Sequence, residues 1–465
     1  MPLLRYISGR SRTRFAQCAA LALFAALAVP LQARTAADAA VAPAYREAVE
    51  SAEALAAAVV DEANLPGLSI AVGIDGAIVW SEGFGYADVE LGVPVTPLTR
   101  FRIGSVSKPF TATAVGLLYE AGKLDLDVPV QRYVPDFPEK RWPVTTRQLG
   151  GHIAGIRHYR DDEFLSSRHY GGVLEGLQIF ADDPLLFEPG TDYSYSSYGW
   201  NLISAVVQSA SGEEFLPFMM QRVFRPLGMR HTVPDQVTAI IPQRSSYYEQ
   251  EPEGRLVNAP FVDNSYKWAG GGFLSTTEDL IRFGFGYIRD PLLKPETVEL
   301  LFTPQRLDSG EGTGYGIGWS TREDWDGRRT VGHTGGSVGG TTAFWTYPKQ
   351  QMVIAAVSNL SDAPGLTRLV FALGELFTPP AEPAVVDEQI AGRYSFETMP
   401  TADEKAKTGT MEIMRTPDGY SGWIRGDLPY ARIAWVGPAA DGLRIFAAGR
   451  KGVVALWLHT DGKRW

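Results

Sequence analysis

The stretch that decides how this chain folds is Gly104-Ser105-Val106-Ser107-Lys108-Pro109-Phe110-Thr111, which contains the only Ser-x-x-Lys in the sequence. Strand-like residues 101–103 precede it, and a helical pattern of apolar residues follows as far as Gly122. Because positions i and i+3 share one face of a helix, Ser105 and Lys108 are expected to point the same way.

This pair is a candidate nucleophile and base. A serine hydroxyl becomes nucleophilic when a neighbouring base takes its proton, and Lys108 can be that base if burial or a nearby cation lowers its pKa. Backbone N–H groups at the helix start can also hold an oxyanion. The alternative is that Ser105 caps a helix and Lys108 is a surface charge. Ser-x-x-Lys alone is a weak signal, so the choice depends on the motifs that accompany it.

The composition limits the function classes. The chain has 465 residues, of which 45% are apolar, and a net charge of −10. This length allows up to about three domains, and the acidic balance argues against nucleic acid as a partner. The six histidines show no metal-ligand spacing, so we expect no metal, and we expect no cofactor either.

Residues 1–33 have the pattern of a cleaved secretory signal peptide. Four arginines and no acidic residue accompany a short apolar segment, 19–29, and Leu31-Gln32-Ala33 is an acceptable cleavage site. No apolar run reaches the about 20 residues that span a bilayer. The only cysteine, Cys18, lies inside the signal, so the mature chain would lack disulfides. We expect a periplasmic or secreted protein without a transmembrane span, and an uncleaved membrane anchor is the alternative.

The order of the expected elements predicts a mixed fold. Helical periodicity and strand-like runs occur as a helix over 45–63, a hairpin over 68–80 with its turn at Asp75-Gly76, strands over 341–347 and 353–358, and a closing helix over 366–377. We expect a central antiparallel sheet with the terminal helices on one face. A helical region would be inserted between the Ser105 helix and the late strands.

Two further segments carry candidate site residues. Tyr195 and Ser197 are expected in a loop just before an apolar helix, where the tyrosine can exchange protons if a cation lowers its pKa. The alternative is a packing aromatic residue beside a capping serine. His333-Thr334-Gly335 lies in the late strand region. His152 is better interpreted as a buried histidine that braces a loop, because no partner is near it in sequence.

One motif is a decoy. Gly335-Gly336-Ser337-Val338-Gly339 matches the Gly-x-Ser-x-Gly nucleophile elbow, which requires a strand before the serine and a helix after it. The strand-like segment 341–345 follows instead, so we reject the elbow.

The character of the chain changes near residue 388. Short strand-like runs separated by turns such as Asp441-Gly442 indicate a small all-antiparallel module, either a sheet or a barrel. The predicted organisation is a signal peptide over 1–33, a linker over 34–44, a main domain over 45–378, a linker over 379–387 and a small all-β domain over 388–465.

The chain order Ser105-x-x-Lys108, Tyr195-Ser196-Ser197, His333-Thr334-Gly335 resembles the class C β-lactamase and D-alanyl-D-alanine carboxypeptidase family of penicillin-binding serine hydrolases. The resemblance covers about residues 45–378. It is strongest to the mitochondrial serine β-lactamase-like members, on stretches such as 120–127, 155–159 and 262–272. It implies an α+β fold of the β-lactamase/transpeptidase type, with a central antiparallel sheet and an inserted helical region, to which the C-terminal β domain is added.

The resemblance also implies roles for the residues. Ser105 would be acylated, and Lys108 and Tyr195 would share general-base and proton-shuttle duty. The backbone N–H groups of Ser105 and Gly336 would form the oxyanion hole. Ser197, His333 and Thr334 would contact the substrate. Relatives usually have asparagine at Ser197 and often lysine at His333, so efficient β-lactam hydrolysis is in doubt.

An imidazole normally changes charge between about pH 5 and 8, so His333 is expected to bind a substrate carboxylate less well as pH rises. The alternative is that His333 only packs against the neighbouring strand. The predicted function is an exported serine hydrolase acting on a small peptide, amide or ester substrate. Peptidase, esterase and weak β-lactamase activities stay open, and a non-catalytic, penicillin-binding or filament-forming scaffold with self-association is the second hypothesis.

Overall fold

The computed structural model describes residues 43–378, 390–397, 408–416, 419–427, 430–439 and 442–459. The predicted signal peptide, nearly all of the first linker and the second linker therefore lie outside the described residues. Within the described ranges, no helix combines the length and apolar character needed to cross a membrane. The predicted domain boundaries stay a prediction.

An N-terminal helix and a β-hairpin open the described chain. The helix α1 spans Arg46–Glu62, and the hairpin consists of β1, Gly67–Ile74, and β2, Ala77–Asp88. Both residues of the connecting turn have positive φ, 51° at Asp75 and 86° at Gly76. A two-residue turn of this kind matches the twist of the flanking strands, and it confirms the predicted hairpin.

The late strands join this hairpin in one seven-stranded antiparallel sheet, in the order β3-β2-β1-β12-β11-β10-β9. Its remaining strands are β3 (Val93–Pro94), β9 (Ser320–Glu323), β10 (Arg329–Ser337), β11 (Gly340–Tyr347) and β12 (Met352–Ser358). The central pairing joins β1 to β12, from Leu68 opposite Ser358 to Ile74 opposite Met352. The predicted central antiparallel sheet is thus confirmed.

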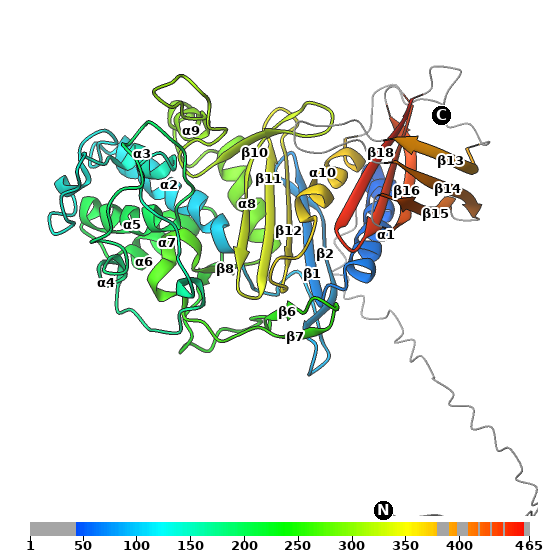
Figure 1. Cartoon of the computed structure of the whole chain (residues 1–465), viewed down its shortest axis with the longest axis horizontal. Coiled ribbons are helices and arrows are strands. Elements are labelled where there is room, and N and C mark those ends of the chain that lie inside the picture. Colours follow the sequence, from blue (N-terminus) through cyan, green and yellow to red (C-terminus); the bar gives the residue numbers. More distant parts are fainter. Residues whose placement is uncertain are drawn as a thin grey trace, which may run out of the picture. The chain divides into compact units, whose positions relative to one another are not determined.

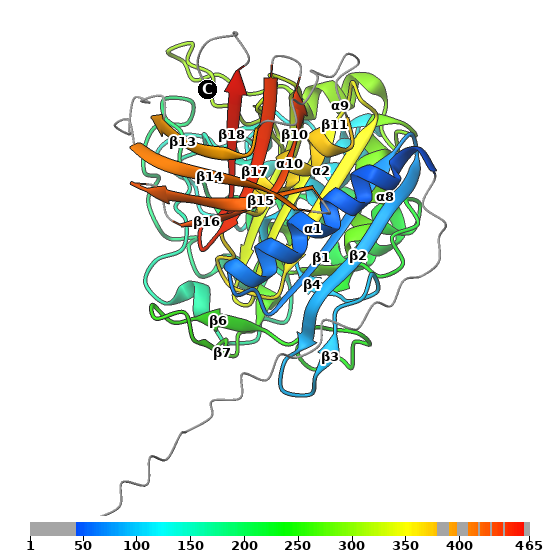
Figure 2. The same ribbon diagram turned by 90° about the vertical axis from the view of Figure 1, so that its right-hand side faces the viewer.

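Helices cover both faces of this sheet. The terminal helices α1 and α10, Leu366–Leu376, lie on one face, and α8, Thr277–Ile288, lies on the other (Figures 1 and 2). Every residue of β1 and β12 is buried, as expected for strands enclosed on both sides. The predicted placement of the terminal helices is confirmed.

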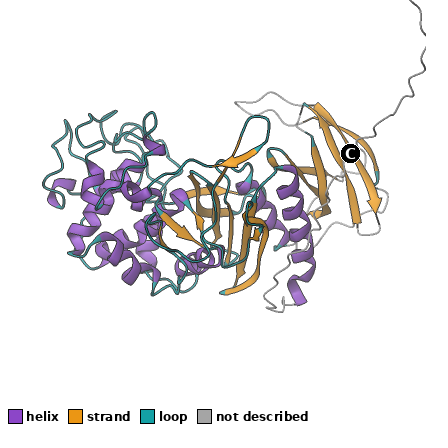
Figure 3. Ribbon diagram, turned by 90° about the horizontal axis from the view of Figure 1, so that it is seen from below, coloured by secondary structure: helices purple, strands orange, loops and turns teal. Residues whose placement is uncertain are grey.

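The inserted helical region lies on the side of the sheet away from α1 (Figure 1), where Figure 3 shows most of the helices gathered. Its helices are α2 (Ser107–Glu120), α3 (Thr146–Gly150), α4 (Val173–Leu177), α5 (Ser197–Ser211), α6 (Phe215–Phe218), α7 (Trp268–Gly271) and α9 (Pro295–Phe302). Short strands complete it: β4 (Phe101–Arg102), β5 (Val233–Pro234), β6 (Tyr248–Gln250), β7 (Leu256–Asn258) and β8 (Phe273–Ser275). A continuous apolar core joins this region to the sheet.

The C-terminal residues form a six-stranded antiparallel sheet in sequential order. Its strands are β13 (Gly392–Glu397), β14 (Thr408–Thr416), β15 (Gly419–Gly426), β16 (Ala431–Ala439), β17 (Gly442–Gly449) and β18 (Gly452–His459). Among the described strands, β13 and β18 are the edges, so the module is an open sheet and not a barrel. Phe446 and Val453 pack into the apolar cluster of α1 and α10, and Arg444 pairs with Glu375 of α10.

Candidate active site

Ser105 lies in a tight turn between β4 and α2. The turn is a 3-10 turn over Gly104–Val106, and the α-helix proper begins at Ser107, two residues later than the motif residue. A Cβ on Gly104 would lie 2.4 Å from the carbonyl oxygen of Gly336, and one on Gly335 would lie 2.0 Å from that of Ile103. Only glycine permits so close an approach, which brings β10 against the turn that carries Ser105.

Lys108 points at Ser105 from the first turn of α2. Its Nζ lies 2.9 Å from Ser105 Oγ, 3.0 Å from Ser197 Oγ and 2.8 Å from the carbonyl oxygen of Gly270. The side chain is fully buried, so the alternative of a surface lysine is wrong. The expected shared orientation of Ser105 and Lys108 is confirmed.

The environment of Lys108 favours a neutral amine. Burial, and secondly the nearby Lys267, lower the pKa of Lys108 well below its ordinary value. In the structure Nζ donates to Ser105 Oγ, to Ser197 Oγ and to the Gly270 carbonyl oxygen. A neutral amine has two N–H donors and one lone pair, so when Lys108 loses one proton the contact with Ser105 can reverse and the hydroxyl can donate to the lone pair. This geometry prepares Ser105 for loss of its proton.

Tyr195 stands beside this pair, just before α5. The centre of its ring lies 4.8 Å from Lys108 Nζ. Burial raises the pKa of Tyr195 above its ordinary value, and a hydrogen bond with Ser105 offsets only part of that rise. The lowering by a cation that the sequence suggested does not occur, so the phenol is protonated at neutral pH and can donate a proton. The capping residue of α5 is Ser196, whose Oγ accepts from the N–H of Gly199.

Two histidines hold the Tyr195 loop in place. The N–H of Ser196 donates to His152 Nδ1 at 3.0 Å, and the N–H of Ser197 donates to His158 Nδ1 at 3.1 Å. The His152 ring also packs on Tyr195 at 4.2 Å between ring centres. His152 is therefore the bracing residue that the sequence predicted. Burial and Lys108 lower the pKa of His158 to about 4, so both imidazoles act as neutral acceptors.

His333 lies on β10 with both ring nitrogens engaged. Its Nε2 pairs with the Tyr315 hydroxyl at 2.7 Å, and its Nδ1 pairs with the Thr334 carbonyl oxygen at 2.5 Å. Because a carbonyl oxygen only accepts, the proton sits on Nδ1 and the tyrosine donates to Nε2. Burial and Lys108 lower the pKa of His333 to about 3. The expected titration of His333 between pH 5 and 8 is therefore wrong, chiefly because the imidazole is buried. The Thr334 side chain is exposed.

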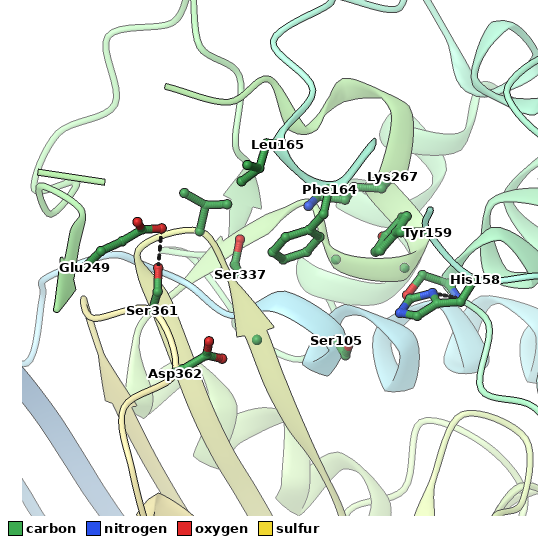
Figure 4. Close-up of a pocket in the computed structure, with 15 residues that line it drawn as sticks. Ser105, His158, Tyr159, Phe164, Leu165, Glu249, Lys267, Ser337, Ser361 and Asp362 are labelled. Atoms are coloured by element: carbon green, nitrogen blue, oxygen red, sulfur yellow. Dashed lines mark hydrogen bonds between the residues drawn. The ribbon is translucent and has the colours of Figure 1, made fainter. Parts of the chain in front are cut away.

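A cleft of about 520 Å³ opens in front of Ser105 (Figure 4). Of the predicted residues, Ser105, Ser197 and Gly336 line it, and Lys108 contacts Ser105 and Ser197 from the buried side. The remaining lining residues are His158, Tyr159, Phe164, Leu165, Glu249, Lys267, Gly270, Gly271, Ser337, Val338, Ser361 and Asp362.

The sequence did not mark these other lining residues as site residues, and three of them, His158, Tyr159 and Lys267, carry titratable side chains close to Ser105 or Lys108. Lys267 stands three positions before Gly270, which accepts from Lys108, and this nearness to a glycine run was the available signal. His158 and Tyr159 come from a loop whose position depends on tertiary packing.

The rejection of the Gly-x-Ser-x-Gly elbow is confirmed, because β10 ends at Ser337 and the next element is the strand β11.

Comparisons with known proteins agree with this geometry. A model of the β-lactamase family matches residues 52–373. The human mitochondrial serine β-lactamase-like protein LACTB is 35% identical over 403 residues, covering 66% of this chain and 73% of LACTB. Penicillin-binding protein 4* of Bacillus subtilis is 27% identical over 346 residues, covering 69% of this chain and 76% of that protein. The solved octameric penicillin-binding protein homologue from Pyrococcus abyssi shares the fold, with a TM-score of 0.62 and 24% identity over 88% of this chain and 96% of its own.

Proposed function

Because this chain belongs to the β-lactamase family of serine hydrolases, we propose that it hydrolyses small peptide, amide or ester substrates through an acyl-enzyme on Ser105. Lys108 is the base that activates the serine, and Tyr195 is the acid that protonates the leaving group. The observation that carries the proposal is the set of three hydrogen bonds around Lys108 Nζ, to Ser105, Ser197 and Gly270.

The acylation step follows from these contacts. Ser105 Oγ attacks the substrate carbonyl carbon while its proton passes to the neutral amine of Lys108. The tetrahedral intermediate carries an oxyanion, which the N–H groups of Ser105 and Gly336 hold, and such donors usually give the largest single contribution. The Tyr195 phenol then gives its proton to the departing amine or alcohol, and Lys108 returns a proton to Tyr195.

Deacylation reverses these proton transfers. Water gives one proton to the Tyr195–Lys108 pair and attacks the ester carbon, and Ser105 leaves with a proton from the same pair. Two moderate barriers thereby replace one high barrier. Ser197 contributes by holding Lys108 in place through its Oγ. Since Ser197 lacks the amide that relatives present here, we expect slow turnover of β-lactams.

The proposal is tested with two chromogenic substrates, a p-nitrophenyl ester and a p-nitroanilide of the same acyl group. Wild type should turn over at least one of them, and Ser105→Ala should lose at least about 10³-fold in kcat/KM while keeping the unfolding midpoint. The matched control is Ser309→Ala, at an exposed serine outside the lining of the cleft, which should keep most activity. An active Ser105→Ala variant would refute the proposal.

Export to the periplasm or the medium is part of the proposal. Its support is the arginine-rich start, the apolar segment 19–29 and the candidate cleavage site after Ala33. Sequencing the N-terminus of protein recovered from the cell envelope should show a start after Ala33. A start at Met1 would favour the uncleaved anchor.

A scaffold function is the alternative to hydrolysis, and it predicts a stable assembly with no turnover of either substrate.

A further inference from the structure

Lys267 is a second buried lysine at the cleft, and the mechanism above gives it no contact with the substrate, although its charge helps to lower the pKa of Lys108. It ends a 3-10 helix over Asn264–Lys267 and directly precedes α7, the helix whose Gly270 carbonyl oxygen contacts Lys108. Its side chain is 2% exposed and lines the cleft that contains Ser105. Figure 4 shows its amine beside Phe164 at the same cleft.

Aromatic rings surround this amine. Its Nζ lies 4.2 Å from the ring centre of Phe164, 5.3 Å from that of Tyr266 and 5.6 Å from that of Tyr159. Within the described residues, Lys267 Nζ forms no hydrogen bond with another group and no ion pair with a carboxylate. Aromatic faces stabilise a cation only in part, and a buried ammonium without an anion is costly. The site therefore lacks the anion that a charged Lys267 requires.

The carboxylate whose charge acts on Lys267, that of Asp235, is already engaged. Asp235 accepts from Arg102 Nε at 2.7 Å and from Asn264 Nδ2 at 2.9 Å, and it lies 3.5 Å from Arg244. Burial and the charge of Arg102 lower the pKa of Lys267 to about 7, although Asp235 opposes this effect. Near neutral pH the amine is thus readily protonated when an anion arrives.

We propose that Lys267 binds a carboxylate of the substrate in the cleft, and this inference rests on the hydrolytic function proposed for Ser105. A single ammonium among aromatic rings suits a monoanionic carboxylate, whereas a phosphate dianion calls for several donors. Glu249 and Asp362 lie at the opposite end of the cleft from Lys267 (Figure 4). Their charges repel an acidic group from that end, so the carboxylate is directed to Lys267.

The structure of His333 supports this assignment. Both of its nitrogens are bonded within the protein, so a neutral His333 has no free donor for a substrate carboxylate. Lys267 supplies the cation that His333 does not.

The test compares mono-p-nitrophenyl glutarate with its methyl ester, which differ only in the free carboxylate. In wild type, kcat/KM should favour the acid. In Lys267→Met, this preference should fall about 10- to 100-fold, the effect of losing one charge-assisted hydrogen bond. Loss of the Lys267 charge also acts on Lys108, but that change affects both substrates alike, so the ratio of the two kcat/KM values reports the carboxylate contact. Lys267→Arg should restore part of the preference. Lys349→Met, at an exposed lysine of the β11–β12 turn, should leave the preference unchanged.

A binding measurement separates this inference from the proposed function. Calorimetric titration of Ser105→Ala needs no turnover, and it should give a Kd for the acid at least about tenfold below that of the methyl ester. The Ser105→Ala/Lys267→Met double variant should lose this difference. Equal Kd values for the two esters in Ser105→Ala, or an equal fall for both substrates in Lys267→Met, would overturn the role of Lys267. If Ser105→Ala binds the acid more tightly than the methyl ester but wild type hydrolyses neither, the proposed hydrolysis is refuted and the role of Lys267 in binding stands.

Discussion

The amine of Lys108 lies 2.9 Å from the hydroxyl of Ser105, and its other two partners come from distant parts of the chain, Ser197 and the carbonyl oxygen of Gly270. A carbonyl oxygen can only accept, so one N–H of Lys108 is committed to Gly270. The lone pair is left for Ser105 when the lysine is neutral. The segment around α7 therefore orients the base as well as forming a wall of the cleft.

Turnover should require neutral Lys108. Lys108→Arg keeps a permanent charge and cannot accept the Ser105 proton, so kcat/KM for a neutral ester should fall at least about 10³-fold, as it should in Lys108→Met. In wild type, kcat/KM should rise with pH through the pKa of Lys108, which burial holds well below the usual lysine value. The measurement is the pH profile of kcat/KM. A flat profile on the acid side together with an active Lys108→Arg variant would contradict the assignment.

Tyr195→Phe should separate the acid role from the base role. Burial keeps the Tyr195 phenol protonated at neutral pH, so its loss removes the proton for the leaving group. An amine leaving group must be protonated before it can depart, whereas p-nitrophenolate can leave as an anion. We expect kcat to fall about 10²- to 10⁴-fold on a p-nitroanilide and clearly less on the matched ester. An equal loss on both substrates would show that Tyr195 serves another step.

His333 should remain neutral across the physiological range. Its pKa is lowered to about 3, so the imidazole charges only in strong acid, and it loses its bond from Tyr315 if it does. Nitrogen-15 NMR of the imidazole should report the Nδ1–H tautomer from about pH 8 down to at least pH 5. Tyr315→Phe serves as the control that removes the partner of Nε2. A titration midpoint between pH 5 and 8 in wild type would restore the expectation from sequence.

Features that depend on local periodicity could be predicted from the sequence. The shared direction of Ser105 and Lys108 follows from helical spacing, and the hairpin follows from the two strand-like runs on either side of the Asp75-Gly76 turn. The protonation states could not be predicted in the same way. They depend on burial, which arises when segments remote in sequence pack together. His333 and Lys267 illustrate this, because their pKa values depend first on burial and then on charges from remote elements, Lys108 of α2 for His333 and Arg102 of β4 for Lys267.

Arg102 should be important for stability at the edge of the site. Its Nε donates to Asp235 at 2.7 Å, and the pair is almost completely buried. Arg102→Met leaves the Asp235 charge without its main partner, so the free energy of unfolding should fall by about 3–5 kcal/mol. Urea denaturation measures this change. The control is Arg255→Ala, which breaks the exposed pair with Glu251 and should cost less than about 1 kcal/mol. Equal effects of the two substitutions would contradict the importance of the buried pair.

The central claim is that Ser105 is the nucleophile, and intact-protein mass spectrometry after reaction with a fluorophosphonate tests it most directly. The probe forms a stable bond with an activated serine oxygen and releases fluoride, so the test does not depend on knowing the substrate. We predict one adduct per chain, mapped by peptide sequencing to Ser105, absent in Ser105→Ala, greatly slowed in Lys108→Met and retained in Ser309→Ala. An adduct that persists in Ser105→Ala, or an unlabelled wild type under conditions that label a control serine hydrolase, would contradict the claim.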